Sequence, residues 1–269
     1  MKLELSCLDI TLDEATGQLT FGEGVLCDGG SDKVLGQMKG LYADMSGCDL
    51  AQRVYWAYRN IRRVSDDALW VPRGLRYDIT VLLPGDAKGE LFKTSGHYHG
   101  LDQGMALPYP EVYEVLCGEV AFVLQKSPAL LADGCGAEPV DAVRVLVVHD
   151  GEAIVIPPFW GHGSINVSDD PSAFSNIAVV DTPLLYGPVR ERRGLAVRVT
   201  RMGDGWGVAT NEAWQPVANT RTLRPHEASE LGIIADVPCY EAYVADPARF
   251  DYLRAPQHAV AHMEELLEV

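Results

Sequence analysis

The sequence has no hydrophobic run near the roughly 20 residues that a membrane-spanning helix requires. Its first residues, MKLELSCLDITLDE, also lack the basic start and the long apolar stretch of an export signal. We therefore expect a cytoplasmic protein that does not bind a membrane. The chain has no internal repeat and no low-complexity tract. With 269 residues, 47% of them hydrophobic, it can form a sizeable core.

Basic residues are scarce: 22 Lys and Arg stand against 38 Asp and Glu, for a net charge of −16. Such a surface repels nucleic acids and anionic membranes, so we expect no nucleic-acid partner. An anionic small molecule would need local help from a metal ion, backbone amides or a few basic side chains. The overall field of the protein would repel it.

The cysteines show none of the CxxC or zinc-ribbon spacings that mark metal or redox motifs, although the chain has six of them. In a cytosolic protein of this size we expect reduced and mostly buried thiols. Cys117 lies in an apolar, β-prone segment and is expected in the core.

The sequence does contain three imidazoles and a carboxylate next to β-prone segments. His97 and His99 stand two residues apart, so on a strand they point to the same face. Glu111 begins a second apolar run, and His162 follows a third run at residues 153–156. This ligand set suits a divalent first-row metal. Ligands delivered by three separate strands predict a metal site on a β-barrel.

Strand-like runs recur over residues 75–199, with Gly, Pro or Asp between them, as is typical of a β-sandwich or closed barrel. Residues 49–63 fit either a short helix or a strand. The segment 28–30 has the composition of a turn, and residues 100–110 and 127–139 that of loops. A helix is expected to start near Pro225, and a terminal helix near residue 261.

Two spaced motifs complete this pattern. Glu111 is followed by Gly118, and a second set comprises Gly151, Pro157, His162 and Asn166, with Phe159 where the motif has its middle glycine. The chain therefore resembles the cupins. More specifically, it resembles the cupin-type glucose-6-phosphate isomerases of archaea and some bacteria, because the signature T-x-G-H-x-H, E-V-Y and P-P-[YF]-W-x-H-x-x-x-N is almost intact.

The resemblance covers roughly residues 8–214. It implies an all-β double-stranded β-helix (jelly-roll) barrel in a domain spanning 1–214, with its barrel core at about 75–200 and peripheral N-terminal segments. Residues 215–269 are then a short, partly helical C-terminal extension. The resemblance also implies a homodimer.

The resemblance further implies an activity and a site. The activity is the interconversion of glucose 6-phosphate and fructose 6-phosphate. One divalent metal ion per subunit (Fe, Mn, Zn or Ni) would be held by His97, His99, Glu111 and His162. The sugar phosphate would be bound by Thr80, Thr94 and Gly96, with Tyr55, Tyr113 and Tyr186 around the sugar. Hydroxyls and a glycine amide can bind phosphate without a basic cluster, which suits an acidic protein.

The chemistry assigns roles to some of these residues. We expect Glu111 to be both metal ligand and general base, with Tyr113, Tyr186 or a water assisting ring opening. A hydride shift stays open as an alternative route. Ala178 and Leu184 stand where the archaeal enzymes carry a further Tyr and His. The Phe159 position also lacks the hydroxyl of a family tyrosine.

Other functions remain possible for the same ligand set. These are an isomerase of another sugar or sugar phosphate, an Fe(II) cupin dioxygenase, and a non-catalytic cupin that binds a metal and a sugar phosphate. Among residues outside the motifs, the arginines at 190, 192 and 193 are expected on a solvated face. The same holds for His258 and His262, which lack a carboxylate partner in sequence.

Overall fold

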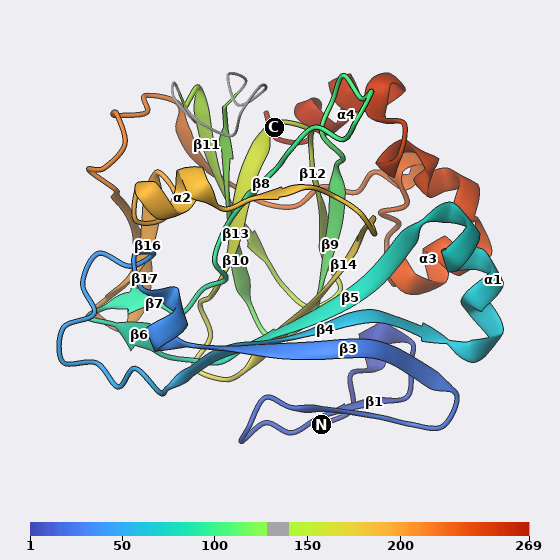
Figure 1. Ribbon diagram of the computed structural model, residues 1–269, viewed down its shortest axis with the longest axis horizontal. Coiled ribbons are helices and arrows are strands. Elements are labelled where there is room, and N and C mark those ends of the chain that lie inside the picture. The colour runs from blue at the N-terminus through green and yellow to red at the C-terminus, as the bar shows by residue number, and fades with distance from the viewer. Residues whose placement is uncertain (128–139, 269) are drawn as a thin grey trace.

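The computed structural model describes residues 1–127 and 140–268. Two β-sheets face each other and enclose the larger part of the core (Figure 1). The six-stranded sheet has the order β12 (Ala153–Ile156), β9 (Glu111–Cys117), β14 (Ser172–Val179), β5 (Leu75–Leu82), β4 (Arg53–Arg63), β3 (Val25–Val34). The four-stranded sheet has the order β13 (Trp160–Asn166), β10 (Val120–Lys126), β11 (Ala142–Val148), β18 (Thr220–Leu223). This arrangement confirms the expected all-β fold, with two facing sheets that form a barrel.

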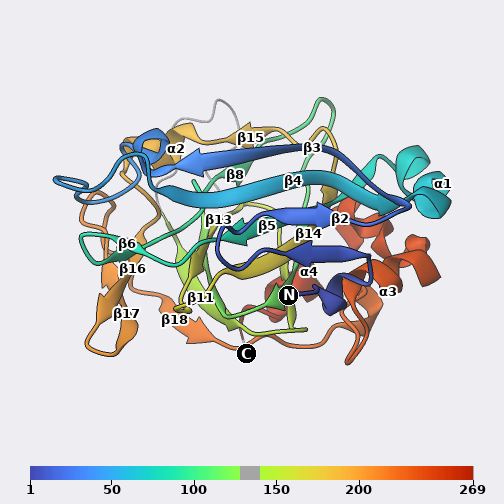
Figure 2. The same cartoon turned by 90° about the horizontal axis from the view of Figure 1, so that it is seen from below.

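Three further sheets flank the two main ones. One sheet has the order β17 (Gly205–Thr210), β16 (Val197–Met202), β7 (Glu90–Leu91), β6 (Asp86–Ala87). A second joins β15 (Leu184–Leu185) to β8 (Tyr98–His99). The N-terminal β1 (Ile10–Leu12) and β2 (Leu19–Phe21) form a hairpin that lies beneath the six-stranded sheet (Figure 2).

Four strands of the six-stranded sheet, β12, β9, β14 and β5, are buried along almost their whole length, which explains why they are so apolar. The edge strand β3 is half-buried or exposed along its length. On β9, Tyr113 and Val115 face the core between the two sheets, whereas Val112 and Leu116 face outward. The outward face packs against the N-terminal segment and the C-terminal helices. Strand β9 is therefore buried along its whole length. Cys117, as expected, is buried and carries a free thiol.

Short helices cover the outside of the sheets. The α-helices are α1 (Asp67–Trp70), α2 (Gly187–Glu191), α3 (Cys239–Ala245), α4 (Val260–Glu265). The 3-10 turns are η1 (Glu4–Ser6), η2 (Leu35–Met38), η3 (Val64–Asp66), η4 (Val71–Arg73), η5 (Ser229–Leu231), η6 (Pro247–Leu253), η7 (Pro256–His258). Trp70 of α1 stacks on Tyr243 of α3 with ring centroids 3.8 Å apart, which joins the C-terminal segment to the barrel. No helix in the described chain is long and apolar enough to cross a membrane.

Several local predictions can be compared with these elements. Residues 53–63, where helix and strand were both open, form β4 because β3 and β5 flank it on either side. The terminal helix is confirmed as α4. Residues 100–110 contain no helix or strand, as expected of a loop. The predicted loop 127–139 lies, after its first residue, outside the described residues.

Two local predictions were wrong. Residues 28–30, expected to form a turn, lie inside β3, since an edge strand tolerates Gly-Gly and the partner β4 supplies the pairing. No α-helix starts at Pro225. The amides of Ala228 and Ile233 pair with each other's carbonyls across a tight bridge, so that segment forms only the single turn η5.

Candidate metal centre and its pocket

The predicted ligands meet at one point inside the barrel. His97, His99, Glu111 and His162 each offer an atom that lies within 4.8 Å of the others. His97 and His162 exchange both backbone hydrogen bonds, at 3.0 and 2.9 Å, which brings their side chains together. His99 lies on β8, Glu111 is the first residue of β9, and His162 lies within β13 rather than just beyond β12.

Backbone carbonyls orient two of the imidazoles. Nδ1 of His99 lies 2.7 Å from the carbonyl oxygen of Tyr109, and Nδ1 of His162 lies 3.3 Å from that of Trp160. Their Nε2 atoms lie 3.2 and 3.3 Å from Oε2 of Glu111. A carbonyl that accepts the Nδ1 proton leaves the Nε2 lone pair for a metal, as in many metal sites.

The two carboxylate oxygens of Glu111 have different surroundings. Oε1 accepts a 2.7 Å hydrogen bond from Nδ2 of Asn176. Oε2 is buried and has no hydrogen-bond partner among the described residues. A buried carboxylate oxygen without a donor, surrounded by imidazole nitrogens, is what a cation would satisfy. These residues therefore fit a divalent metal ion.

The electrostatics favour the ligand form of these groups. Burial disfavours the charged form of Glu111. The neighbouring imidazoles of His162 and His99 outweigh this effect and hold its pKa well below the usual value. Burial, together with His162 and His99 nearby, holds the pKa of His97 well below its ordinary value. An ionised carboxylate and a neutral imidazole are the states that coordinate a metal.

Two backbone positions with positive φ shape the site. Gly96 has φ +67°, and a Cβ there would lie 3.3 Å from the Val189 side chain and 3.4 Å from the His162 carbonyl oxygen. Glycine therefore suits the turn that leads into His97. Phe159 has φ +69°, in the left-handed region that favours glycine, which explains why the cupin motif carries Gly at this position.

The predicted substrate residues line one pocket with the metal ligands. The lining includes Tyr55, Thr80, Thr94, Gly96, Tyr113 and Tyr186. The hydroxyl oxygen of Thr94 accepts a 3.0 Å hydrogen bond from the Ser164 amide, and that of Tyr113 lies 3.2 Å from Nε2 of His162. Burial, and next the charge of Glu111, raise the pKa of Tyr113 well above its usual value.

Sequence reasoning missed two arginines on the pocket wall, Arg59 and Arg76. Both pair with Asp78, which is fully buried: Nη1 of Arg59 lies 2.7 Å from Oδ2, and Nε of Arg76 lies 3.0 Å from it. Two guanidinium groups that share one carboxylate leave a surplus positive charge beside the metal ligands. Arg76, Asp78 and Thr80 occupy alternate positions on β5, so their side chains share one face of the strand. Once Thr80 was expected in the pocket, this spacing could have placed Arg76 there as well.

Ala178 and Leu184 also line this pocket. Ala178 pairs with Arg76 between β14 and β5, and Leu184 pairs with His99 between β15 and β8. These two side chains add no polar group at the places where the archaeal pattern has Tyr and His. The exposed Arg190 and Arg193, by contrast, do not line the pocket.

A model of the family described as glucose-6-phosphate isomerase (GPI) matches residues 33–215. A relative named glucose-6-phosphate isomerase from Thermococcus onnurineus (strain NA1) is 28% identical over 141 residues, or 52% of this chain and 65% of that protein. The match thus spans less than two thirds of that relative. Another protein of the same name, from Sinorhizobium medicae (strain WSM419), is 25% identical over 206 residues, covering 76% and 86% of the two chains.

Among solved structures, the chain aligns with recombinant oxalate oxidase in complex with glycolate. The TM-score is 0.35 at 16% identity, over 55% of this chain and 60% of that one.

Proposed function

This chain belongs to the glucose-6-phosphate isomerase family, and we propose that it interconverts glucose 6-phosphate and fructose 6-phosphate with the aid of a divalent metal. The observation that carries the proposal is the buried, unpartnered Oε2 of Glu111 facing the imidazoles of His99 and His162. It supports a metal centre at the end of a pocket that also holds positive charge and hydroxyl groups.

The reaction moves a hydrogen between C1 and C2 of an open-chain sugar. When bound, the metal supplies a Lewis acid for the adjacent carbonyl and hydroxyl oxygens of the substrate. Glu111 takes the proton from one carbon and returns it to the other, while the amide of Asn176 holds its Oε1 in place. Tyr113, whose hydroxyl lies in the same pocket, assists ring opening.

The pocket also accounts for recognition of an anion by an acidic protein. Thr80, Thr94 and Gly96 offer hydroxyl and amide groups, as the family pattern implies. Arg59 and Arg76 add guanidinium groups that suit a phosphate or carboxylate. In this proposal Tyr55 and Tyr186 border the sugar. The metal is one of Fe, Mn, Zn or Ni, because imidazole and carboxylate ligands suit all four.

A coupled assay that follows glucose 6-phosphate formed from fructose 6-phosphate tests the activity. Turnover is expected in metal-loaded protein and is lost with a chelator, then restored by adding metal back. If metal-loaded protein binds fructose 6-phosphate without turning it over, the protein is instead a non-catalytic cupin that binds a sugar phosphate. The lack of polar side chains at Ala178 and Leu184 would explain the loss of activity.

Glu111 needs a separate test, because it is proposed as both ligand and base. Turnover in D2O is expected to introduce deuterium at C2, since the base exchanges its proton with solvent. Turnover without deuterium uptake would indicate a hydride shift and remove Glu111 as the base. The Glu111→Gln variant, assayed with its metal content measured, is expected to be inactive. The matched Glu119→Gln variant, at the turn after the same strand, stays active.

We also propose a cytoplasmic homodimer: the resemblance to the cupin-type isomerases suggests the dimer, and the sequence composition suggests the location. Light scattering of the purified protein and fractionation of the source cells would test these two proposals.

A further inference from the structure

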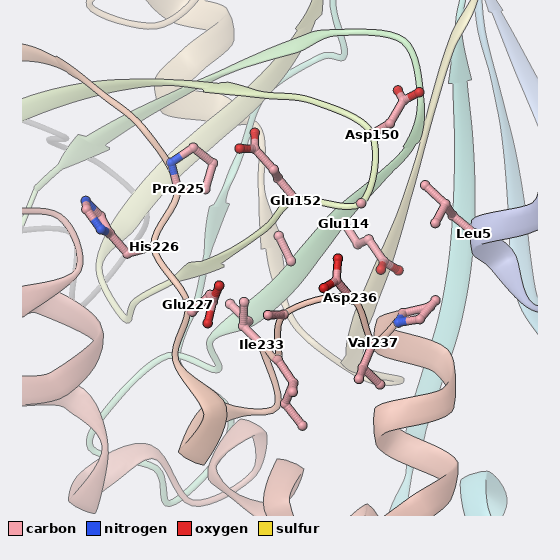
Figure 3. Close-up of a pocket in the computed structure, with 15 residues that line it drawn as sticks. Leu5, Glu114, Asp150, Glu152, Pro225, His226, Glu227, Ile233, Asp236 and Val237 are labelled. Atoms are coloured by element: carbon pink, nitrogen blue, oxygen red, sulfur yellow. The ribbon is translucent and has the colours of Figure 1, made fainter.

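A second cavity lies on the opposite face of the six-stranded sheet from the metal centre. It has a volume of about 530 Å³ and lies between the β9 and β12 side of the sheet and residues 225–238 (Figure 3). The family model ends at residue 215, so the wall that closes this cavity comes from outside the matched region. Its volume is in the range of small-molecule sites.

The charged groups around this cavity are almost all acidic. Its carboxylates are those of Glu114, Asp150, Glu152, Glu227 and Asp236. His226 is the imidazole among the lining residues, and no Lys or Arg lines the cavity in the described chain. The side chains of Asp150, Glu227 and Asp236 make no hydrogen bond or ion pair with any other described residue. These three carboxylates therefore have no cationic partner among the residues that the structure describes.

Glu114 is the buried member of the group, with 2% of its surface exposed. Its Oε1 accepts a 3.0 Å hydrogen bond from the Cys239 amide, whereas Oε2 has no hydrogen bond of normal geometry. Burial raises the pKa of this carboxyl to about 8, although the Cys239 amide and the nearby Ser175 hydroxyl lower it. The ionised form of this buried carboxyl is unfavourable without a cation, so a bound ammonium group would favour ionisation.

The remaining walls are apolar and are formed by Leu5, Ile233, Ile234 and Val237, with Pro225 and Pro238. A divalent metal does not suit this cavity, because the carboxylates do not converge. The metal-ligand group that the described residues form is at His97, His99, Glu111 and His162. An aliphatic ammonium compound suits it better, since each ammonium group can pair with a single carboxylate while the carbon chain packs on the apolar wall.

We propose that this cavity binds a small aliphatic ammonium compound, with its charge toward Glu114 and Asp236 and its carbon chain against Ile233 and Val237. The proposal is independent of the isomerase activity, because the cavity and the metal centre lie on opposite faces of the sheet. Binding would link the extension after residue 215 to the outer face of β9 and β12.

Isothermal titration of the full-length, metal-loaded protein with 1,4-diaminobutane tests the proposal. At about pH 8.5 the diamine is charged and the Glu114 carboxyl is largely ionised. Saturable binding with one site per chain is expected at moderate salt. Butane-1,4-diol, which has the same chain length without charge, is expected not to bind. Absence of saturable diamine binding would overturn the proposal.

Matched variants separate a built site from general attraction to an acidic surface. Glu114→Gln retains the acceptor for the Cys239 amide, and Asp236→Asn suits the φ of +57° at that residue. Each is expected to weaken binding about tenfold, the scale of one lost charge contact in a partly buried site. Asp204→Asn, at the exposed turn between β16 and β17, removes the same charge elsewhere and is expected to have no effect. Equal weakening in all three variants would overturn the proposal.

Discussion

The amide of Asn176 donates a 2.7 Å hydrogen bond to Oε1 of Glu111 and thereby sets the orientation of the candidate metal ligand. Asn176 lies on β14, which pairs with β9, and its side chain is buried. With Oε1 held in this way, Oε2 points toward the imidazoles of His99 and His162. Residues that hold a ligand in place commonly matter nearly as much as the ligands themselves.

Removing this hydrogen bond should weaken metal binding. We expect Asn176→Ala to lower metal affinity by about 10- to 100-fold, because the Glu111 carboxylate is no longer held toward the imidazoles. Competition with a chelator of known affinity measures the change. The control is Ser175→Ala, on the same strand but on its outward face. Equal metal affinity in Asn176→Ala and the unaltered protein would show that Asn176 has no part in the centre.

Arg76 is expected to help bind the phosphate group of the substrate and to have no part in the chemical step. We expect Arg76→Gln to raise the KM for fructose 6-phosphate about tenfold and to leave kcat nearly unchanged. Asp78 keeps its ion pair with Arg59 in this variant, so no buried carboxylate is left unpaired. The control, Arg73→Gln, removes a half-buried arginine that is paired with Asp251 and lies outside the pocket. Steady-state kinetics measure KM and kcat for the two variants, and an unchanged KM in Arg76→Gln would contradict this role.

The buried carboxyl of Glu114 should make folding stability depend on pH. Its pKa is raised from 4.5 to about 8 in the folded protein, so the folded state binds a proton that the unfolded chain releases. This contribution to stability is present below pH 4.5 and is lost progressively as the pH rises to about 8.

In Glu114→Gln this part of the pH dependence disappears. Urea unfolding at pH 6 and pH 8 is the measurement. The free energy of unfolding of the unaltered protein should fall by a few kcal/mol more than that of the variant. Parallel changes in the two proteins would mean that Glu114 is ionised in the folded state.

Arg144 anchors the C-terminus to the barrel from a fully buried position on β11. Its Nε donates a 2.6 Å hydrogen bond to the carbonyl oxygen of Leu267, and its Nη2 lies 2.8 Å from Oε1 of Glu268. Arg144→Met should lower the free energy of unfolding by about 2–4 kcal/mol, since buried carbonyls lose their donor.

Arg221 offers the matched comparison, because it pairs with the same Glu268 carboxylate from an exposed position. Arg221→Gln is expected to change the free energy of unfolding by less than about 1 kcal/mol. Urea unfolding compares the two variants, and amide exchange in α4 shows whether the C-terminus has detached. Similar small effects in both would show that burial of Arg144 does not anchor the C-terminus.

Sequence patterns predicted β5, β9, β10, β11, β12 and β14 of the barrel, because each has an apolar stretch bounded by turn residues. They failed at two places where backbone pairing overrode the local composition. Residues 28–30 have turn composition but are held extended by β4, and the segment after Pro225 is folded back by the bridge between Ala228 and Ile233. Arg59 was missed because its neighbour Asp78 lies on another strand, so local spacing carries no information about the pair.

By itself, the sequence determined the chemistry of the ligand set and the alternation of side chains along each strand. Glu111 and Glu114 illustrate what the sequence alone did not determine. They stand three residues apart on β9, so alternation places them on opposite faces, but it does not say what lies on either side. Tertiary packing decided that Glu111 meets three imidazoles and Asn176, whereas Glu114 meets Cys239 and a cavity formed by the C-terminal segment. These partners are brought together by strand pairing and by burial of apolar surface, which act between segments distant in sequence.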